Sequence, residues 1–216
     1  MITIHAAYNF PGAKGIVRDI RAFWALEELG LPYAVKWFDY TKGGPAVMER
    51  RTVNPFGKIP ALEDGGHHLF ESGAIVLYIF DNGGKGPQDA HARAEVNQWC
   101  FAALNTIEPT TIELLRWAYR WQDRPGREQR LAEVMATAEE QFTDLSRALG
   151  ERDYLVGNVF GPADILMSTA LDFARGETAL FERFPTVAAY RERCRARPAY
   201  QKALSKQGEG PKAAAA

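Results

Sequence analysis

Two features of residues 53–79 could together hold a peptide. The stretch reads VNPFGKIPALEDGGHHLFESGAIVLYI, in which Pro60 opens a predicted strand and Glu71-Ser72 opens a predicted helix. A proline that starts a strand fits a cis bond to Ile59, which turns the chain so that the Ile59 amide and carbonyl can pair with an extended peptide. Ser72 is a preferred helix N-cap, and a helix N-terminus attracts a carboxylate. An ordinary capping serine would explain Ser72 alone, but the preceding proline favours a site for a peptide carboxylate.

The elements expected around these residues form a compact N-terminal domain over residues 1–82. ITIHAA alternates as a half-buried strand does, Ile16, Ile20, Phe23 and Trp24 repeat with a helical period up to Gly30, and YAVKWF is a second strand. This order is a βαβ unit. A short helix over residues 46–52, a hairpin of IPALED and HHLF around Gly65-Gly66, and a helix from Ser72 to near Asn82 complete the domain.

Helical periods alone continue beyond this domain. The breaker-rich NGGKGP predicts a linker over residues 83–89, and an all-helical domain follows over residues 90–206. Pro109 should break or kink the first long helix, because proline has no amide hydrogen and crowds the preceding turn. Gly161, Pro162 and Asp164 predict a helix start whose role is structural. The last residues, 207–216, are expected to be a flexible tail.

The composition excludes several classes of protein. The 216 residues are 46% hydrophobic, and 26 basic against 27 acidic side chains give a formal charge of −1, so no excess of charge indicates nucleic acid or an anionic membrane. There is no apolar run long enough to span a bilayer and no signal peptide, which predicts a cytoplasmic protein. Cys100 and Cys194 stand far apart, and the histidines lack ligand spacing, so neither disulfides nor a metal site is expected.

The run from Asn54 to Tyr78 resembles the glutathione-binding half of the cytosolic glutathione transferases, whose pattern is N-P-x-G-x-(V/I)-P-x-L, a hairpin, then E-S-x-A-I. LEELGLPY and DYLVGNVFGPADILMS are similar to two further family segments. The resemblance implies a bacterial-type member of α+β/α class, with a thioredoxin-like N-terminal domain and an all-helical C-terminal domain. It also implies a homodimer that uses glutathione as co-substrate, needs no metal, and detoxifies a small electrophile.

The same resemblance assigns roles to the peptide-holding residues. Ile59 and its neighbours would pair with the cysteinyl part of glutathione, Ser72 would bind the γ-glutamyl carboxylate, and Glu71 would place the neighbouring ammonium. The glycine carboxylate needs a cation, for which Lys42 is preferred over Arg50 and Arg51. The residues expected to bind glutathione are thus Lys42, Lys58, Ile59, Pro60, Glu71 and Ser72.

The resemblance also implies a group that turns the glutathione thiol into a thiolate, usually a hydroxyl or thiol near the end of the first strand. Residues 8–19 contain no serine or cysteine. Tyr8 stands where tyrosine-type members carry their hydroxyl, Asn9 could donate through its amide, and Arg18 could stabilise a thiolate by charge. Asn9 as a loop residue with a local backbone bond and Arg18 as a surface charge are the alternatives.

The helical domain is expected to contribute Phe101 and Asn105 to the pocket for the second substrate, with packing or a dimer interface as alternatives. The leading hypothesis is an enzyme that adds the glutathione thiolate to an electrophilic, apolar substrate. A disulfide or peroxide reductase without an active-site cysteine is the first rival. A non-catalytic interaction module on the same fold is the second.

Overall fold

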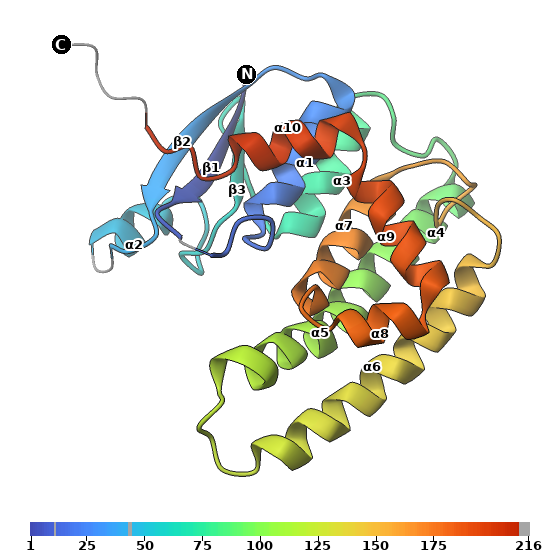
Figure 1. Ribbon diagram of the computed structural model, residues 1–216. Coiled ribbons are helices and arrows are strands. Elements are labelled where there is room, and N and C mark those ends of the chain that lie inside the picture. Colours follow the sequence, from blue (N-terminus) through green and yellow to red (C-terminus); the bar gives the residue numbers. More distant parts are fainter. Residues whose placement is uncertain (11, 43–44, 212–216) are drawn as a thin grey trace. The chain divides into compact units, whose positions relative to one another are not determined.

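The computed structural model describes residues 1–10, 12–42 and 45–211, with the side chains of residues 45 and 46 left out. The chain divides into two compact units. One comprises Met1–Gly86 together with Arg197–Ala216, and the other comprises Pro87–Ala196. Figure 1 shows that a sheet lies in the first unit and that the second is built from helices.

A four-stranded sheet forms the centre of the first unit, with strand order β2-β1-β3-β4. The strands are β1 (Ile2–Tyr8), β2 (Tyr33–Asp39), β3 (Ala61–Asp64) and β4 (His67–Phe70). β1 pairs with β2 in parallel and with β3 antiparallel, and β3 pairs antiparallel with β4. The predicted βαβ unit and the predicted hairpin are therefore both confirmed, as expected from the thioredoxin-like domain that the resemblance implies.

The helices of the first unit are α1 (Asp19–Leu29), α2 (Pro45–Arg50), α3 (Ser72–Asn82) and α10 (Pro198–Lys206). Helix α1 ends as predicted at Gly30, which adopts a left-handed φ of 63°. It begins three residues later than the pattern suggested, so Ile16 lies outside the helix. Gly12 and Gly15 have φ values of 76° and 84°, which an α-helix does not accommodate, and they keep the preceding segment as a loop.

The C-terminal part of the chain requires a correction. Helix α10 packs along α1, where the rings of Trp24 and Tyr200 meet edge to face with centroids 4.7 Å apart and Arg197 forms an ion pair with Glu28 (Figure 1). Residues 198–206 therefore belong to the first unit and not to the helical domain predicted over residues 90–206. Burial of an aromatic pair, worth roughly 2 kcal/mol for each ring, accounts for this docking.

The predicted flexible tail over residues 207–216 is also wrong for its first part. Gln207 is 1% exposed and Gly210 is buried within the first unit. Polar contacts of the Gln207 side chain, described below, anchor this segment. Residues 212–216 lie outside the described residues.

The second unit contains six α-helices in its described residues, joined by π-helical and 3₁₀ segments. They are α4 (Ala90–Phe101), η1 (Ala102–Ile107), α5 (Glu108–Leu115), η2 (Arg116–Arg120), α6 (Arg127–Leu149), α7 (Pro162–Leu171), η3 (Asp172–Ala174), α8 (Thr178–Arg183) and α9 (Pro185–Arg195), of which η1 and η2 are π-helical and η3 is a 3₁₀ turn. Pro109 does not break the chain of helices. The π-helical segment before it changes the hydrogen-bond register, so that proline falls in the first turn of α5, where its missing amide hydrogen costs little.

The predicted helix start at Gly161 is confirmed and is structural. Asp164 accepts hydrogen bonds from the Gly161 amide at 2.9 Å and, with its other oxygen, from the Leu155 amide and the Tyr190 hydroxyl. Asp164 is 1% exposed. One buried carboxylate therefore ties the start of α7 to a preceding loop and to α9. Within the described residues, no helix is both long and apolar enough to cross a membrane.

Candidate functional site

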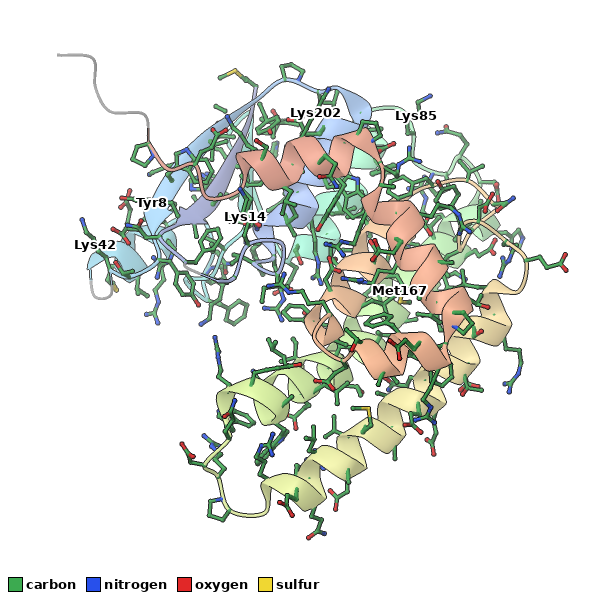
Figure 2. The ribbon with its side chains drawn as sticks, in the orientation of Figure 1. Tyr8, Lys14, Lys42, Lys85, Met167 and Lys202 are labelled. Atoms are coloured by element: carbon green, nitrogen blue, oxygen red, sulfur yellow. The ribbon has the colours of Figure 1, made fainter. Side chains whose placement is uncertain are left out.

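The strand register brings most of the predicted site residues to one edge of the sheet. His5 of β1 is opposite Ala61 of β3, so the carboxyl end of β1, at Tyr8, extends past the start of β3. Ala61 is also opposite Phe70 of β4, so the residues just before β3 and just after β4 are neighbours at the open end of the hairpin. Tyr8 is paired with Asp39 at the end of β2. Figure 2 shows Tyr8 and Lys42 at this edge.

The segment before β3 presents a fixed backbone at this edge. The bond between Ile59 and Pro60 is cis, as predicted. The Ile59 amide and carbonyl have no hydrogen-bond partner in the described part of the chain. Asn54, 3% exposed, donates to the Lys58 carbonyl at 2.9 Å and accepts from the Phe56 amide at 2.9 Å. Two side-chain bonds therefore hold the loop while the Ile59 backbone stays available.

The segment after β4 offers the start of α3. Glu71 is the N-cap of this helix and has a φ of 67°, an uncommon value for a residue other than glycine. Its side chain is exposed. Ser72, 6% exposed, is the first helical residue and not the N-cap as predicted. The unpaired amides of the first turn of an α-helix carry partial positive charge, so the site retains its preference for an anion.

Arg21 is a residue that the sequence interpretation missed. It lies on α1, is 1% exposed, and donates from Nη1 to Ser72 Oγ at 3.0 Å. Its guanidinium places a cationic group behind the start of α3, which favours an anion there. The available signal was the position of Arg21 beside Ile20, Phe23 and Trp24, since a cation within an apolar helix face needs a polar partner.

The three candidates for thiol activation occupy different environments. Tyr8 is half buried, and its hydroxyl has no hydrogen-bond partner in the described part of the chain. Asn9 has a left-handed φ of 59° and donates from Nδ2 to Asp39 Oδ2 at 3.0 Å, so its bond is to a strand carboxylate rather than to the local backbone. Arg18 is exposed just before α1. Asn9 is thus already engaged, whereas Tyr8 retains a hydroxyl proton to donate.

The three cations considered for the glycine carboxylate of glutathione also lie in different environments. Arg50 donates from Nε to the Gly57 carbonyl at 2.9 Å, which makes it a support of the loop. Lys42 is exposed and follows β2 at the same edge as Tyr8. Arg51 is exposed at the end of α2. Residues 43–44, next to Lys42, lie outside the described residues.

The remaining predicted site residues lie in the helical unit. Phe101 is 59% exposed and Asn105 is exposed, on α4 and on the π-helical segment that follows it. Their role in a substrate pocket stays a prediction.

Cys100 and Cys194 are both buried and free, and burial raises the pKa of the Cys100 thiol to about 12. The thiol of Cys100 is therefore not a nucleophile at neutral pH.

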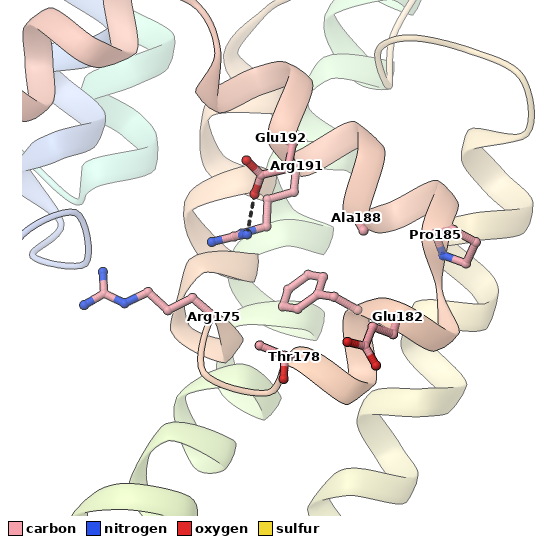
Figure 3. Close-up of a pocket in the computed structure, with 8 residues that line it drawn as sticks. Arg175, Thr178, Glu182, Pro185, Ala188, Arg191 and Glu192 are labelled. Atoms are coloured by element: carbon pink, nitrogen blue, oxygen red, sulfur yellow. Dashed lines mark hydrogen bonds and ion pairs between the residues drawn. The ribbon is translucent and has the colours of Figure 1, made fainter.

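A surface pocket of about 360 Å³ lies in the same unit, between α8 and α9 (Figure 3). One of its charged groups, Arg191, pairs with Glu192 in the lining and with the buried Asp172. No ligand is assigned to it. Across the described ranges, no group of three or more His, Cys, Asp or Glu side chains is placed to hold a metal ion.

Comparison with known proteins identifies the family of the chain. Family models described as "Glutathione S-transferase, N-terminal domain" and "Glutathione S-transferase, C-terminal domain" match residues 20–81 and 107–198. Glutathione S-transferase 3 of Zea mays is 30% identical over 92% of this chain and 92% of its own length. Glutathione S-transferase hmp2 of Hypomyces subiculosus is 29% identical over 86% of this chain and 92% of its own.

Solved structures give the same result for the fold. A glutathione transferase family member from Pseudomonas fluorescens, solved with two bound glutathione, is 26% identical, with a TM-score of 0.81 over 94% of this chain and 92% of that one. The nitrogen regulation fragment of the yeast prion protein Ure2p, at 22% identity, has the same TM-score over 95% of this chain and 96% of its own, and shows a shared fold only. The chain therefore belongs to the glutathione S-transferase family.

Proposed function

We propose that the first unit binds glutathione at the sheet edge where β1 and β4 end and β3 begins, and that the protein activates its thiol for attack on a small electrophile. One observation carries this proposal. The Ile59 backbone, the amide-rich start of α3 and the buried Arg21 meet at one edge, which suits a peptide with a terminal carboxylate.

Each part of glutathione has a suitable group at this edge. The cysteinyl backbone pairs with Ile59 beside Pro60, as an added strand would. The γ-glutamyl carboxylate lies at the start of α3, where it receives Ser72 and the first-turn amides with the charge of Arg21 behind them. Glu71 attracts the neighbouring ammonium. Lys58 flanks the cysteinyl segment, and Lys42 attracts the glycine carboxylate.

The nucleophile is the sulfur of glutathione itself. The sequence has two cysteines, both in the helical unit and both buried, which argues against a protein thiol as the reactive group. Tyr8 is the favoured activating residue, because its hydroxyl proton is available to stabilise a thiolate. Asn9 and Arg18 act on the sulfur only if Tyr8 does not.

The second substrate and the assembly are further parts of the proposal. Phe101 and Asn105 contribute to the pocket for a small, apolar electrophile. Reduction of a disulfide or peroxide by glutathione stays a rival reaction, since it also needs an activated glutathione thiolate. The protein acts as a homodimer in the cytoplasm, where its two free cysteines remain reduced. Elution as a 24.1 kDa monomer would contradict the dimer.

Calorimetric titration with glutathione tests the binding part. The chain should bind glutathione at sub-millimolar concentration, Ser72→Ala should weaken binding about tenfold, and Ser205→Ala, an exposed serine on α10, should leave it unchanged. Absence of binding at millimolar glutathione would overturn the proposal. Binding without turnover of any electrophile, disulfide or peroxide would instead favour an interaction module.

The thiolate absorbance of bound glutathione, followed against pH, tests the activating residue. Tyr8→Phe should raise the apparent pKa of the bound thiol, because the variant removes a hydrogen bond to the charged form. An unchanged profile in Tyr8→Phe together with a shifted profile in Asn9→Ala would move this role to Asn9.

A further inference from the structure

The side-chain amide of Gln207 is buried against the loop between β1 and α1. Its Oε1 accepts a hydrogen bond from the Gly15 amide at 2.6 Å, and its Nε2 donates to the Val17 carbonyl at 2.8 Å. The same Nε2 donates to Asp19. Gln207 comes directly after α10, so a residue near the end of the chain binds the loop that leads from the first strand to the first helix.

Asp19 extends this contact to the strand that carries Tyr8. The Asp19 carboxylate, 0% exposed, accepts from Gln207 with one oxygen and from the Ala7 amide with the other, at 3.0 Å. Ala7 immediately precedes Tyr8. The end of β1, the loop and the C-terminal segment are thus joined in one buried hydrogen-bonded cluster.

Two glycines bring the backbone of the C-terminal segment against the aromatic rings of this region. Gly208 and Gly210 have φ values of 79° and 75°. A Cβ atom at Gly208 would lie 3.0 Å from Cζ of Phe10, and one at Gly210 would lie 3.2 Å from Cδ2 of Tyr8. Both distances are shorter than ordinary contacts, so the close approach requires glycine at each position.

Two glycines raise the entropic cost of holding the loop in one conformation. Residues 12 and 15 are glycines with positive φ, and ordering glycine costs more conformational entropy than ordering other residues. Its described internal backbone bonds run from the Ala13 amide to Phe10 and from the Ile16 and Val17 amides to Ala13. The Gln207 side chain adds to these bonds an anchor from outside the loop, at Gly15 and Val17.

We propose that Gln207, with Asp19, is a positioning residue for the thiol chemistry: it fixes the β1–α1 loop and the end of β1 so that Tyr8 and its neighbours present to the glutathione sulfur. This inference rests on the proposed function. Gln207 acts through the loop and not by contact with glutathione, because its amide is 1% exposed and both its oxygen and its nitrogen are bound within the protein.

The test separates binding of the peptide from activation of the thiol. Three variants are made in the full-length chain: Gln207→Leu, which removes all side-chain bonds; Gln207→Glu, which keeps the shape and the acceptor for Gly15 but loses the donors; and Gly210→Ala, which crowds the Tyr8 ring. Ser205→Ala is the control, since Ser205 is exposed on α10, two residues before Gln207. Thermal unfolding checks that each variant is folded.

Affinity for S-methylglutathione, which has no thiol to activate, is compared with the thiolate fraction of bound glutathione and with kcat for an aryl halide. Gln207→Leu and Gly210→Ala should keep S-methylglutathione affinity within about twofold and lower the thiolate fraction and kcat by about tenfold or more, as displaced catalytic groups do. Gln207→Glu should lose at least as much as Gln207→Leu, because it sets a second carboxylate against Asp19 and an acceptor against the Val17 carbonyl. Ser205→Ala should match the unchanged protein.

Two results would overturn the inference. One is a folded Gln207→Leu variant with an unchanged thiolate fraction and kcat. The other is a parallel loss of S-methylglutathione affinity and kcat, since Gln207 would then support the fold as a whole. If the unchanged protein binds no S-methylglutathione, the proposed function has failed. Amide hydrogen exchange then tests whether Gln207 still holds the β1–α1 loop. Exchange over residues 12–18 should be faster in Gln207→Leu than in Ser205→Ala.

Discussion

The two halves of the proposed glutathione site are held in different ways. The peptide-holding half around Ile59 is fixed by residues close to it in sequence, as Asn54 bonds to Lys58 and Arg50 to Gly57. The loop after Tyr8 is instead fixed by Gln207, from the other end of the chain. A locally built site can be recognised as a motif, whereas a site completed by a distant residue leaves no contiguous pattern.

Helix α1 serves both halves through neighbouring residues. Asp19 bonds to Ala7 and Gln207 on the side of the loop, whereas Arg21 bonds to Ser72 at the start of α3. Residues two apart on a helix point in different directions, so one helical turn can support two segments. Both side chains are at most 1% exposed. A substitution at Asp19 should therefore perturb the half at the loop, and one at Arg21 the half at the start of α3.

The largest expected effect is on the pH dependence of stability through Asp19. Burial raises the pKa of Asp19 from 3.8 to about 6, so the folded state favours the protonated carboxyl. The stability that Asp19 contributes is therefore fully present below about pH 4 and is lost as the pH rises through 6, by about 3 kcal/mol. Urea unfolding of the unchanged protein and of Asp19→Asn should diverge by this amount across that range.

His5 changes stability in the opposite direction, because burial lowers the pKa of its imidazole and stability is lost as the pH falls below 6.5. This contribution is present in both proteins and cancels in their difference. Parallel pH profiles of the unchanged protein and Asp19→Asn would show that the carboxyl of Asp19 is not perturbed.

The next largest effect is expected in the peptide-holding half. Arg21→Met keeps the length of the side chain and removes its charge, so glutathione affinity should fall by about 2 kcal/mol, roughly thirtyfold. Lys85→Met removes a charge from an exposed position in the same unit and is the matched control. Calorimetry with S-methylglutathione makes the measurement. Equal affinities for the two variants would remove Arg21 from the site.

A smaller effect is expected at the exposed cation. Lys42→Ala should weaken glutathione binding by up to about fivefold at low salt and less at high salt, because an exposed ion pair is worth no more than about 1 kcal/mol and is screened. Arg51→Ala is the control. A larger loss of glutathione affinity in Arg51→Ala than in Lys42→Ala would indicate that Arg51, and not Lys42, binds the glycine carboxylate.

The smallest effect lies in the helical unit and should leave glutathione binding untouched. Gly161 has an extended φ of −156°, and a Cβ there would lie 4.0 Å from the Val159 carbonyl oxygen. Gly161→Ser therefore adds a hydroxyl to the helix cap without strain and should raise the free energy of unfolding by a few tenths of a kcal/mol. A change in glutathione affinity would contradict the structural assignment of this motif.

Sequence patterns predicted the strands, the hairpin and the cis bond before Pro60 correctly, because strand alternation, Gly30 and the run from Asn54 to Tyr78 are local signals. They misplaced Gln207 and helix α10, whose positions depend on tertiary contacts. Nothing in QGEGPKAAAA reveals that Gln207 will be buried, since its partners are the backbone of Gly15 and Val17 and the carboxylate of Asp19. Helix α10 shows an ordinary amphipathic pattern, which does not reveal the unit on which it packs.

The most direct test of the account is a calorimetric comparison of glutathione with cysteinylglycine, which lacks the γ-glutamyl group. The start of α3, Ser72 and Arg21 recognise the γ-glutamyl carboxylate in this account, so glutathione should bind at least about tenfold more tightly, and Arg21→Met should narrow the difference. Equal affinity for the two peptides, or an unchanged difference in Arg21→Met, would contradict it.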